Sequence, residues 1–293
     1  MTLPPILPLG TSIVTRIPVP PHPAGAVAVI VRAPIDPHHS YRVRFAGGSE
    51  ATLSRGSFGV RKHEKARLPD AERDFTPYIQ LRVVVGSRAF GLDTETSDTD
   101  LRGFYLPPAR EEWSLAGVPE QLEFGEECYW EAKKFVLLAL KANPNILEVL
   151  HSPLVLDASP LARELLDIRQ AFLSKLVYQT YGGYVMGQFK RMEADLRTSG
   201  EVRWKHAMHL LRLLHSGTQL LRTGELVLDV GPERERLLAV KRGELTWAEV
   251  EAWRLELHAE FDRAAERSEL PERPDYASAE DWLLRARRAA VEW

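Results

Sequence analysis

The sequence predicts an α+β protein built in three consecutive parts. Residues 1–67 contain short β-rich runs separated by prolines and glycines, which is typical of a small all-β domain. Residues 68–155 mix β-branched runs with short helical patterns, and this combination favours a compact domain with a small mixed sheet. Residues 156–293 show long segments with helical periodicity, so we expect a C-terminal helical domain there.

The first part contains four expected strands. In the third of these, Tyr41, Val43 and Phe45 alternate with two arginines, as expected for a strand with one buried and one solvated face. Gly47-Gly48-Ser49 is a natural hairpin loop between the last two strands. The pattern resembles a small SH3-like β-barrel. The expected strands are residues 12–17, 26–32, 41–45 and 51–53.

Charge is distributed unevenly along the chain. The net charge is −3, but residues 1–67 hold nine Lys or Arg against three acids, which gives +6 there and −9 for the remainder. A basic module on an acidic body favours a polyanionic partner such as nucleic acid. A rigid docking role, in which the charge only aids solubility, fits the same residues, and the composition leaves both interpretations open.

The chemistry is expected in the second part, at a Gly-Ser turn followed by two acids. A β-branched run, 83–85, ends at Gly86-Ser87, and Asp98 and Asp100 follow just before a second apolar run. On a strand these two carboxylates would share a face, where they repel each other unless a cation lies between them. Hard oxygen ligands suit Mg²⁺, and a Gly-Ser turn offers the backbone N–H groups that hold phosphate. The spacing therefore predicts phosphoryl or nucleotidyl chemistry.

Other cationic residues are placed near this turn by the sequence. Arg88 either steers phosphate or faces solvent, and the sequence does not decide between these roles. Arg102 alternates with Asp100, so we expect it on the same strand face, paired with a catalytic carboxylate or with the substrate.

The remaining elements follow from periodicity and breakers. We expect a linker with a short helix over 61–77, a loop or short helix over 109–120, and one strand over 121–130. Short helices are expected over 131–141 and 146–150, and Thr246 with Glu249 matches a capping box. In the third part the expected helices cover residues 161–172, 174–198, 202–223, 232–242, 247–268 and 279–291.

Taken together, these motifs resemble the DNA polymerase β-type nucleotidyltransferase superfamily, and within it the RNA-ligase-associated and YcgL-like branch. The resemblance extends from about residue 83 to the C-terminus. It implies Mg²⁺ or Mn²⁺, an NTP substrate and a third carboxylate, for which Glu126 is the candidate, with Glu123 and Glu127 as neighbouring alternatives. The motifs are Gly86-Ser87-Arg88-Ala89-Phe90-Gly91, Ser97-Asp98-x-Asp100-x-Arg102-Gly103, Lys133-Lys134 and Asn143-Pro144-Asn145-Ile146-Leu147-Glu148.

A second cluster of cationic residues lies in the helical part. Lys205, His209 and Arg212 share one helix face, with His206 beside them, and they either grip the triphosphate or form a solvated basic stripe. Lys133 either reaches the phosphates or stays on the surface. Tyr181, Tyr184 and Phe189 are expected in the core rather than as a platform for bases.

The expected activity is transfer of a nucleoside monophosphate from an NTP to a hydroxyl, with an RNA end as the preferred acceptor. Two alternatives are a nucleotidyltransferase that modifies a protein or small molecule, and a non-catalytic RNA-binding protein with a degenerate site. The lone Cys128 cannot form an internal disulfide, and there is no signal peptide and no apolar run of spanning length. We therefore expect a cytoplasmic protein without a membrane partner.

Overall fold

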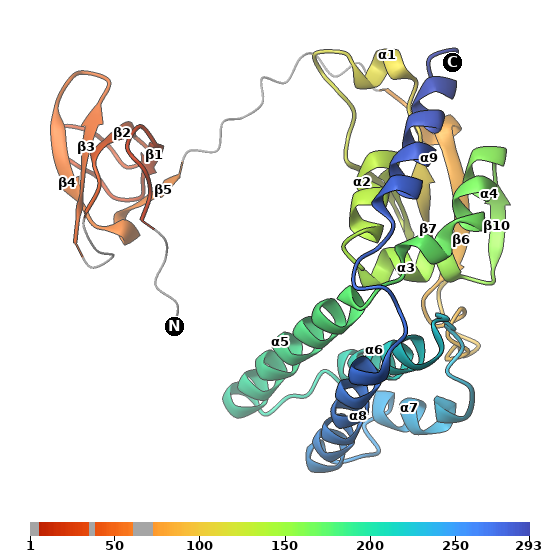
Figure 1. Ribbon diagram of the computed structural model, residues 1–293. Helices are drawn as coiled ribbons and strands as arrows, with labels where there is room; N and C mark the ends of the chain where they lie inside the picture. The colour runs from red at the N-terminus through yellow and green to blue at the C-terminus, as the bar shows by residue number, and fades with distance from the viewer. Residues whose placement is uncertain (1–5, 35–38, 61–72) are drawn as a thin grey trace. The chain divides into compact units, whose positions relative to one another are not determined.

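The computed structural model describes residues 6–34, 39–60 and 73–293. Its contacts divide the chain into two compact units, Met1–Asp70 and Ala71–Trp293, which are treated separately below. The ribbon in Figure 1 follows the chain through both units. In the part of the chain that is described, no helix has both the length and the apolar character needed to cross a bilayer.

The first unit is a five-stranded antiparallel sheet in the order β4-β3-β2-β1-β5. The third expected strand is confirmed at its predicted bounds, with Tyr41, Val43 and Phe45 buried and Arg42 and Arg44 exposed. Among the described residues the sheet is not closed into a barrel, so the SH3-like barrel is not confirmed. The strands are β1 (Ser12–Thr15), β2 (Val27–Arg32), β3 (Tyr41–Phe45), β4 (Glu50–Leu53) and β5 (Phe58–Val60).

Strand β5 was not predicted. It is only three residues long, and Gly59 at its centre removes the side chain that would have completed an alternating pattern. A 3₁₀ turn, Arg55–Ser57, connects β4 to β5, which then pairs with β1. Phe58 is fully buried in the core of this unit.

The second unit contains a mixed sheet in the order β10-β6-β7-β9-β8. Strands β7 and β9 are parallel and the other neighbours are antiparallel, so the expected mixed sheet is confirmed. The single strand expected over 121–130 is wrong, because a turn at Gly125 (φ +60°) splits it into the hairpin β8–β9. The strands are β6 (Ile79–Val85), β7 (Asp100–Tyr105), β8 (Gln121–Phe124), β9 (Glu127–Glu131) and β10 (Val155–Ala158).

Strand β10 was also not predicted, and it pairs with β6. The boundary expected after residue 155 falls at its first residue, and the division of this unit into two domains stays a prediction. Gly103 in β7 is needed for the pairing with β6, since a Cβ there would lie 1.7 Å from the carbonyl oxygen of Leu81. The β6–β7 register shifts between Ile79 and Leu81, at the same place.

Short helices pack on this sheet. Glu131 and Asn143 are the N-cap residues of helices α2 and α3, and their side chains accept hydrogen bonds from backbone N–H groups of the first turn. The last helix, α9, returns from the far end of the chain to the sheet, where Trp282 packs edge-on against Phe104 of β7 at 5.6 Å (Figure 1). These helices are α1 (Ala109–Glu112), α2 (Ala132–Ala139), α3 (Pro144–His151), α4 (Pro160–Asp167) and α9 (Tyr276–Ala289).

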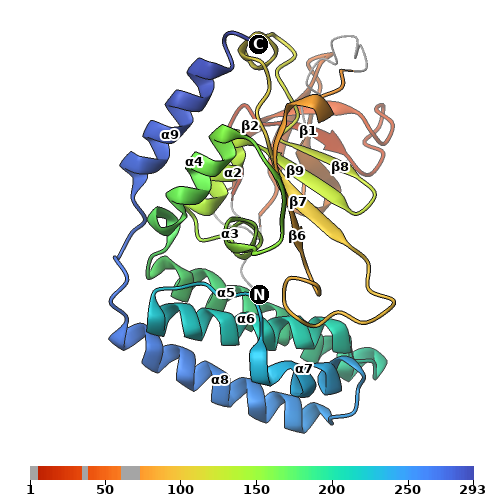
Figure 2. The same ribbon diagram turned by 90° about the vertical axis from the view of Figure 1, so that its right-hand side faces the viewer.

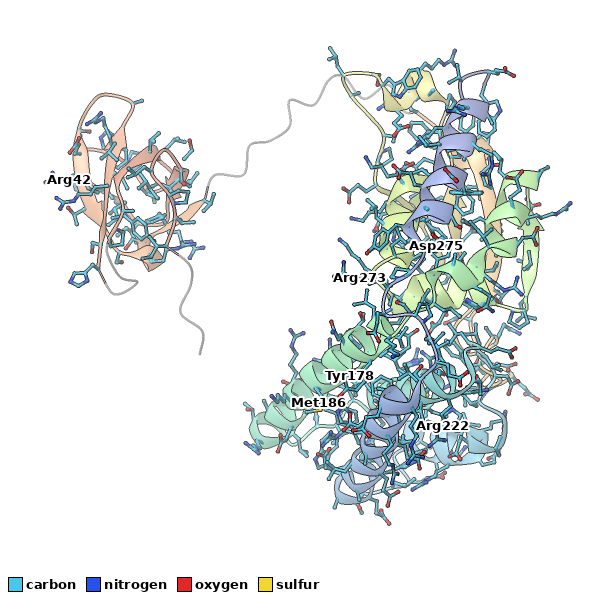
Figure 3. All side chains as sticks on the ribbon, viewed as in Figure 1. Arg42, Tyr178, Met186, Arg222, Arg273 and Asp275 are labelled. Carbon is cyan, nitrogen blue, oxygen red and sulfur yellow. The ribbon has the colours of Figure 1, made fainter. Side chains whose placement is uncertain are left out.

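The other four helices lie together at one end of the unit, and α3 lies between them and the sheet (Figure 2). Gly217 lets α6 approach α8, because a Cβ there would be 2.9 Å from the ring of Phe261. Tyr178 and Met186 of α5 contact α8 through Asp262 and Arg254, and Arg222 of α6 pairs with Glu260 of α8 (Figure 3). The helices are α5 (Leu176–Ser199), α6 (Trp204–Thr223), α7 (Arg234–Lys241) and α8 (Trp247–Arg267).

The helical expectations hold with local changes. The capping box at Thr246 and Glu249 is confirmed. The helix expected over 161–172 is interrupted at Ile168 and continues as a 3₁₀ turn, Arg169–Phe172. The helix expected over 232–242 likewise begins with a 3₁₀ turn, Gly231–Glu233, before α7.

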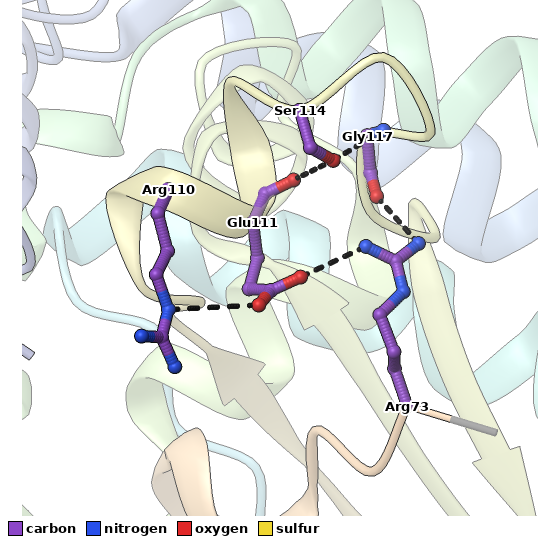
Figure 4. A network of polar contacts seen from close by, with 5 residues as sticks. All are labelled: Arg73, Arg110, Glu111, Ser114 and Gly117. Carbon is purple, nitrogen blue, oxygen red and sulfur yellow. Dashed lines mark hydrogen bonds and ion pairs between the residues drawn. The ribbon is translucent and has the colours of Figure 1, made fainter. Parts of the chain in front are cut away.

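The beginning of the second unit is anchored by polar contacts. Arg73 donates to Glu111 of α1 and to the carbonyl of Gly117, which holds the loop after α1 against the segment that enters β6 (Figure 4). Residues 61–72, where most of the expected linker falls, lie outside the described residues. Residues Thr76–Tyr78 form a 3₁₀ turn that leads directly into β6.

Candidate active site

A cavity of about 550 Å³ opens between the ends of the central strands and the helices α3, α5 and α6. The sheet contributes polar side chains from β7 and β8, and α6 contributes the opposite wall. The residues that line the cavity include Asp100, Arg102, Glu123, Trp130, Glu148, Tyr184, His206, His209 and Arg212, together with Gly86 and Phe90 of the turn after β6.

Gly86 and Asp100 form the floor of this cavity on the sheet side. Strand β6 ends at Val85, which pairs with Asp100, the first residue of β7. Gly86 has φ +70°, and a Cβ there would lie 2.5 Å from Oδ2 of Asp100. Only glycine therefore lets the carboxylate lie directly against the turn, which explains the Gly before the serine in the sequence.

The rest of the Gly-Ser turn is held by its own hydrogen bonds. The N–H of Phe90 donates to the carbonyl of Gly86 (3.1 Å), and the N–H of Leu92 donates to that of Ser87 (2.8 Å). The Arg88 guanidinium donates to the carbonyl of Ser97 at 2.9 Å and so links the turn to the loop that carries Asp98. Ser87 and Arg88 are not among the residues that line the cavity.

Asp98 and Asp100 do not share a strand. Strand β7 begins at Asp100, and Asp98 is an exposed residue of the preceding loop, so the placement of both acids on one strand face is wrong. The alternation rule fails because the chain is still in the loop at Thr99. In the described part of the chain, no three His, Cys, Asp or Glu side chains are gathered closely enough to hold a metal ion together.

Glu126, the candidate third carboxylate, lies in the turn between β8 and β9 with an exposed side chain. Its backbone carbonyl accepts hydrogen bonds from the N–H of Leu101 (3.0 Å) and from Arg102 (2.7 Å). The carboxylates that line the cavity besides Asp100 are Glu123, which was considered as a neighbouring alternative, and Glu148.

Arg102 is placed as the alternation predicted. It lines the cavity on the same face as Asp100, and its guanidinium lies 3.3 Å from Oδ1 of that residue. The pair is partly exposed, so its strength is limited by solvent, but it holds the Asp100 carboxylate in an orientation toward the cavity.

The helical wall contains part of the predicted cationic cluster. His206, His209 and Arg212 line the cavity, whereas Lys205 is exposed and does not. Lys133 is an exposed residue of α2 and is not among the lining residues either, and its neighbour Lys134 pairs with Glu120 at 2.8 Å. Three residues of α6, spaced i, i+3 and i+6, therefore face the sheet across the cavity.

The two histidines are neutral near pH 7. Burial lowers the pKa of His209 to about 4, and the positive charges of Arg212 and Lys205 act in the same direction. Burial and the charge of Arg203 also lower the pKa of His206. The positive charge on this wall therefore comes from Arg212.

Arg212 is almost fully buried and is held on two sides. Its Nη2 donates to Oε1 of Glu148 at 2.7 Å, with side-chain exposures of 6% and 10% for the arginine and the glutamate. Its guanidinium carbon lies 3.7 Å from the centre of the Phe90 ring. Its Nε and Nη1 are buried and have no hydrogen-bond partner among the described residues.

Sequence reasoning missed three residues of this site. Glu148 interrupts an apolar run in α3, and a buried carboxylate needs a partner, which was the available signal. Tyr184 was expected in the core but is 47% exposed and lines the cavity, unlike Tyr181 and Phe189, which are buried as predicted. Trp130 of β9 lines the cavity as well, and its role was not anticipated.

Comparison with known proteins assigns this chain to a family. Residues 60–285 match the model of the RNA repair pathway DNA polymerase beta family, and the chain belongs to this family. The family suggests a nucleotidyltransferase. The chain is also 29% identical over 154 residues to the uncharacterized protein YcgL of Bacillus subtilis (strain 168), covering 50% of this chain and 57% of that protein. No solved structure matches the chain.

Proposed function

We propose that this protein is a metal-dependent nucleotidyltransferase that moves a nucleoside monophosphate from an NTP to a hydroxyl acceptor. The observation that carries the proposal is the contact between Gly86 and the Asp100 carboxylate on the floor of a cavity with arginines on both walls. That arrangement brings an acid suited to a divalent cation next to groups suited to phosphate. The family match supports the same reaction class.

The donor atoms fit a hard cation. Carboxylate oxygens suit Mg²⁺ or Mn²⁺, and Mg²⁺ is commonly held by one or two carboxylates together with substrate phosphates. Asp100 would hold the ion from the floor of the cavity. We propose Asp98 and Glu126 as the further ligands, which requires the loop and the turn that carry them to move toward Asp100, because in the described residues no three such side chains are gathered closely enough to hold a metal ion. The ions would lower the pKa of the attacking hydroxyl and stabilise the departing pyrophosphate.

The chain's own residues orient the triphosphate. Gly86 provides an approach free of side-chain atoms, and Arg102 and Arg212 provide guanidinium donors on opposite walls. Ser87, Arg88, Lys133, Lys205 and His209 were predicted to contact the nucleotide, and of these His209 lines the cavity. The acceptor hydroxyl releases its proton to solvent and its oxygen forms a bond to the α-phosphorus, while the bond from that phosphorus to the bridging oxygen breaks and pyrophosphate leaves with the electron pair.

The proposed acceptor is an RNA end. Support comes from the RNA repair pathway to which the family is assigned and from the first unit, where Arg42 and Arg44 are exposed on one sheet face. The order of the strands and the 3₁₀ turn before β5 are consistent with an SH3-like module, which we propose as a nucleic-acid contact. A single free cysteine fits the cytoplasmic location that we propose.

The test is label transfer from each α-³²P NTP, with Mg²⁺ or Mn²⁺, to a pool of short RNA, tRNA and cell-extract protein. Label in nuclease-sensitive bands supports an RNA acceptor, and label in protease-sensitive bands moves the activity to a protein acceptor. The variant Asp100→Asn is expected to lose transfer. Asp157→Asn, an exposed carboxylate of β10 in the same sheet, is the matched control and should keep it.

A further inference from the structure

Two buried arginines in the second unit have almost the same surroundings. Arg254 of α8 pairs with Glu251 and lies 5.4 Å from the Phe189 ring, and Arg212 of α6 pairs with Glu148 and lies 3.7 Å from the Phe90 ring. Their side-chain exposures are 8% and 6%. Their glutamate partners differ, since Glu251 is 36% exposed and on the same helix as Arg254, whereas Glu148 is 10% exposed and on another helix than Arg212. The two arginines also differ in the number of hydrogen bonds they make.

Arg254 uses all of its nitrogens within the protein. Its Nε and Nη2 both donate to Glu251, and its Nη1 contacts the sulfur of Met186 at 3.4 Å. Arg212 uses only Nη2, and its Nε and Nη1 have no partner among the described residues. Leaving donors of a buried charged group unpaired is energetically unfavourable, so such donors call for an explanation.

The explanation lies in the position of Arg212. It lines the cavity, whereas Arg254 is not among its lining residues. Glu148 and Phe90 fix the guanidinium from the side of α3 and from the Gly-Ser turn, and the two histidines beside it on α6 are neutral near pH 7. A planar guanidinium with two free nitrogens and a fixed orientation matches the oxygens of a phosphate group.

We propose that Arg212 is the site for the terminal phosphate of a polyphosphate chain and that Glu148 is the positioning residue that orients it. This inference rests on the proposed function, since it assigns the end of the triphosphate distal to Asp100 to the helical wall. It follows that the cavity distinguishes nucleoside triphosphates from monophosphates, because a monophosphate held at Gly86 and Asp100 has no second phosphate to contact Arg212.

Binding without turnover tests the inference. The affinity of the full chain for inorganic tripolyphosphate, and separately for AMP, is measured by calorimetric titration. EDTA is present so that no metal-dependent reaction takes place. Arg212→Lys is expected to weaken tripolyphosphate binding at least tenfold and to leave AMP binding within twofold. Glu148→Gln, which keeps the volume but loosens the guanidinium, is expected to weaken it three- to tenfold.

The matched controls are Arg254→Lys and Glu251→Gln, which should bind tripolyphosphate as the unmodified chain does. The double variant Glu148→Gln/Arg212→Gln removes both buried charges together, so it tests binding even if one single variant fails to fold. Near-UV circular dichroism confirms folding. Tripolyphosphate binding unchanged in the folded Arg212→Lys or double variant, or an equal loss of AMP binding, would overturn the inference.

The same titration separates this inference from the proposed function. Asp100→Asn removes the metal carboxylate and is expected to bind tripolyphosphate in EDTA with unchanged or slightly higher affinity. If label transfer is never observed but Arg212→Lys still abolishes tripolyphosphate binding, the anion site stands and the transferase assignment fails. If label transfer is observed but Arg212→Lys binds tripolyphosphate normally, the transferase assignment stands and the anion site at Arg212 fails.

Discussion

The two units each contain a five-stranded sheet, but the sheets are built differently. In the first, among the described residues, every pair is antiparallel, most neighbours follow one another in the chain, and the strands share one small core. In the second, β7 pairs in parallel with β9, which requires the chain to cross over through α1 and β8. The long loop between β6 and β7 and this crossover leave the strand ends free to form the floor of a cavity.

The difference between the two sheets indicates a catalytic site on the second and a binding surface on the first. At one edge of the second sheet Gly86 follows the end of β6 and Asp100 begins β7, and the two residues meet because these strands pair there. The first sheet instead offers a face, with alternating exposed arginines on β3.

The largest effect is expected from Asp100→Asn in the second sheet. Loss of the negative charge on the cavity floor should lower the rate of label transfer at least about 1,000-fold, because divalent metal and triphosphate would no longer be held together. Arg44→Ala in the first sheet should change transfer to a small hydroxyl acceptor less than about twofold. Full activity of folded Asp100→Asn would contradict the assignment of the second sheet as the catalytic one.

Gly103→Ala tests the close pairing of the second sheet. A Cβ there would lie 1.7 Å from the backbone carbonyl of Leu81, and a backbone atom cannot move aside without breaking the β6–β7 pairing. We expect the free energy of unfolding of this unit to fall by about 3 kcal/mol or more.

The matched control is Gly59→Ala in β5 of the first sheet. Its Cβ would lie 3.8 Å from the Arg16 side chain, which is ordinary contact, so the change should stay within about 1 kcal/mol. Denaturant titration followed by hydrogen exchange reads the two units separately. Equal destabilisation by the two substitutions would contradict the close approach of Gly103 to the backbone of Leu81.

The stability of the second unit should depend on pH in the acidic range. Burial lowers the pKa of both His151 and His209 to about 4 in the folded state. Between pH 6.5 and 4 the unfolded chain therefore binds more protons, so stability falls as the pH falls through this window and is fully present above it. Each histidine should lower the free energy of unfolding by up to about 3 kcal/mol at pH 4, because a shift of one pKa unit corresponds to about 1.4 kcal/mol.

The measurement is the denaturation midpoint of this unit against pH, for the unmodified chain and for His151→Gln. The substitution should make the acid side of the profile less steep, because the part of the pH dependence that comes from protonation of His151 is removed. A profile with the same slope in the substituted chain would mean that His151 titrates normally in the folded state.

The smallest effect is expected from the first unit. Removing residues 1–70 should weaken RNA binding about tenfold at moderate salt and reduce its salt dependence, since phosphate contacts by Arg and Lys are released by salt. Arg42→Ala with Arg44→Ala should give part of that loss, about threefold. Transfer to a small hydroxyl acceptor should stay unchanged. Filter binding of RNA across a salt series measures the effect of the deletion and of the double substitution. RNA binding that is independent of salt and survives the deletion would place the RNA on the second unit alone.

Much of the fold and part of the site could be predicted from local patterns. The alternation of Tyr41, Val43 and Phe45, the periodicity of the long helices and the capping box at Thr246 each depend on residues within a few positions, and all hold. The pairing of Arg102 with Asp100 on one face also follows from a period of two. The hairpin β8–β9 was missed because glycine at 125 gave a weak signal against a continuous β-rich run.

The sequence by itself determined the Gly-Ser turn, the two acids after it and the helical nature of the last 130 or so residues, because these depend on side-chain type and short spacing. The tertiary structure alone decided which of these groups meet. It placed Asp100 but not Asp98 in a strand, turned Tyr184 toward the cavity and joined Glu148 of α3 to Arg212 of α6. The physical reason is that a helix face or a strand partner is chosen by burial across the whole unit, over separations that no local period records.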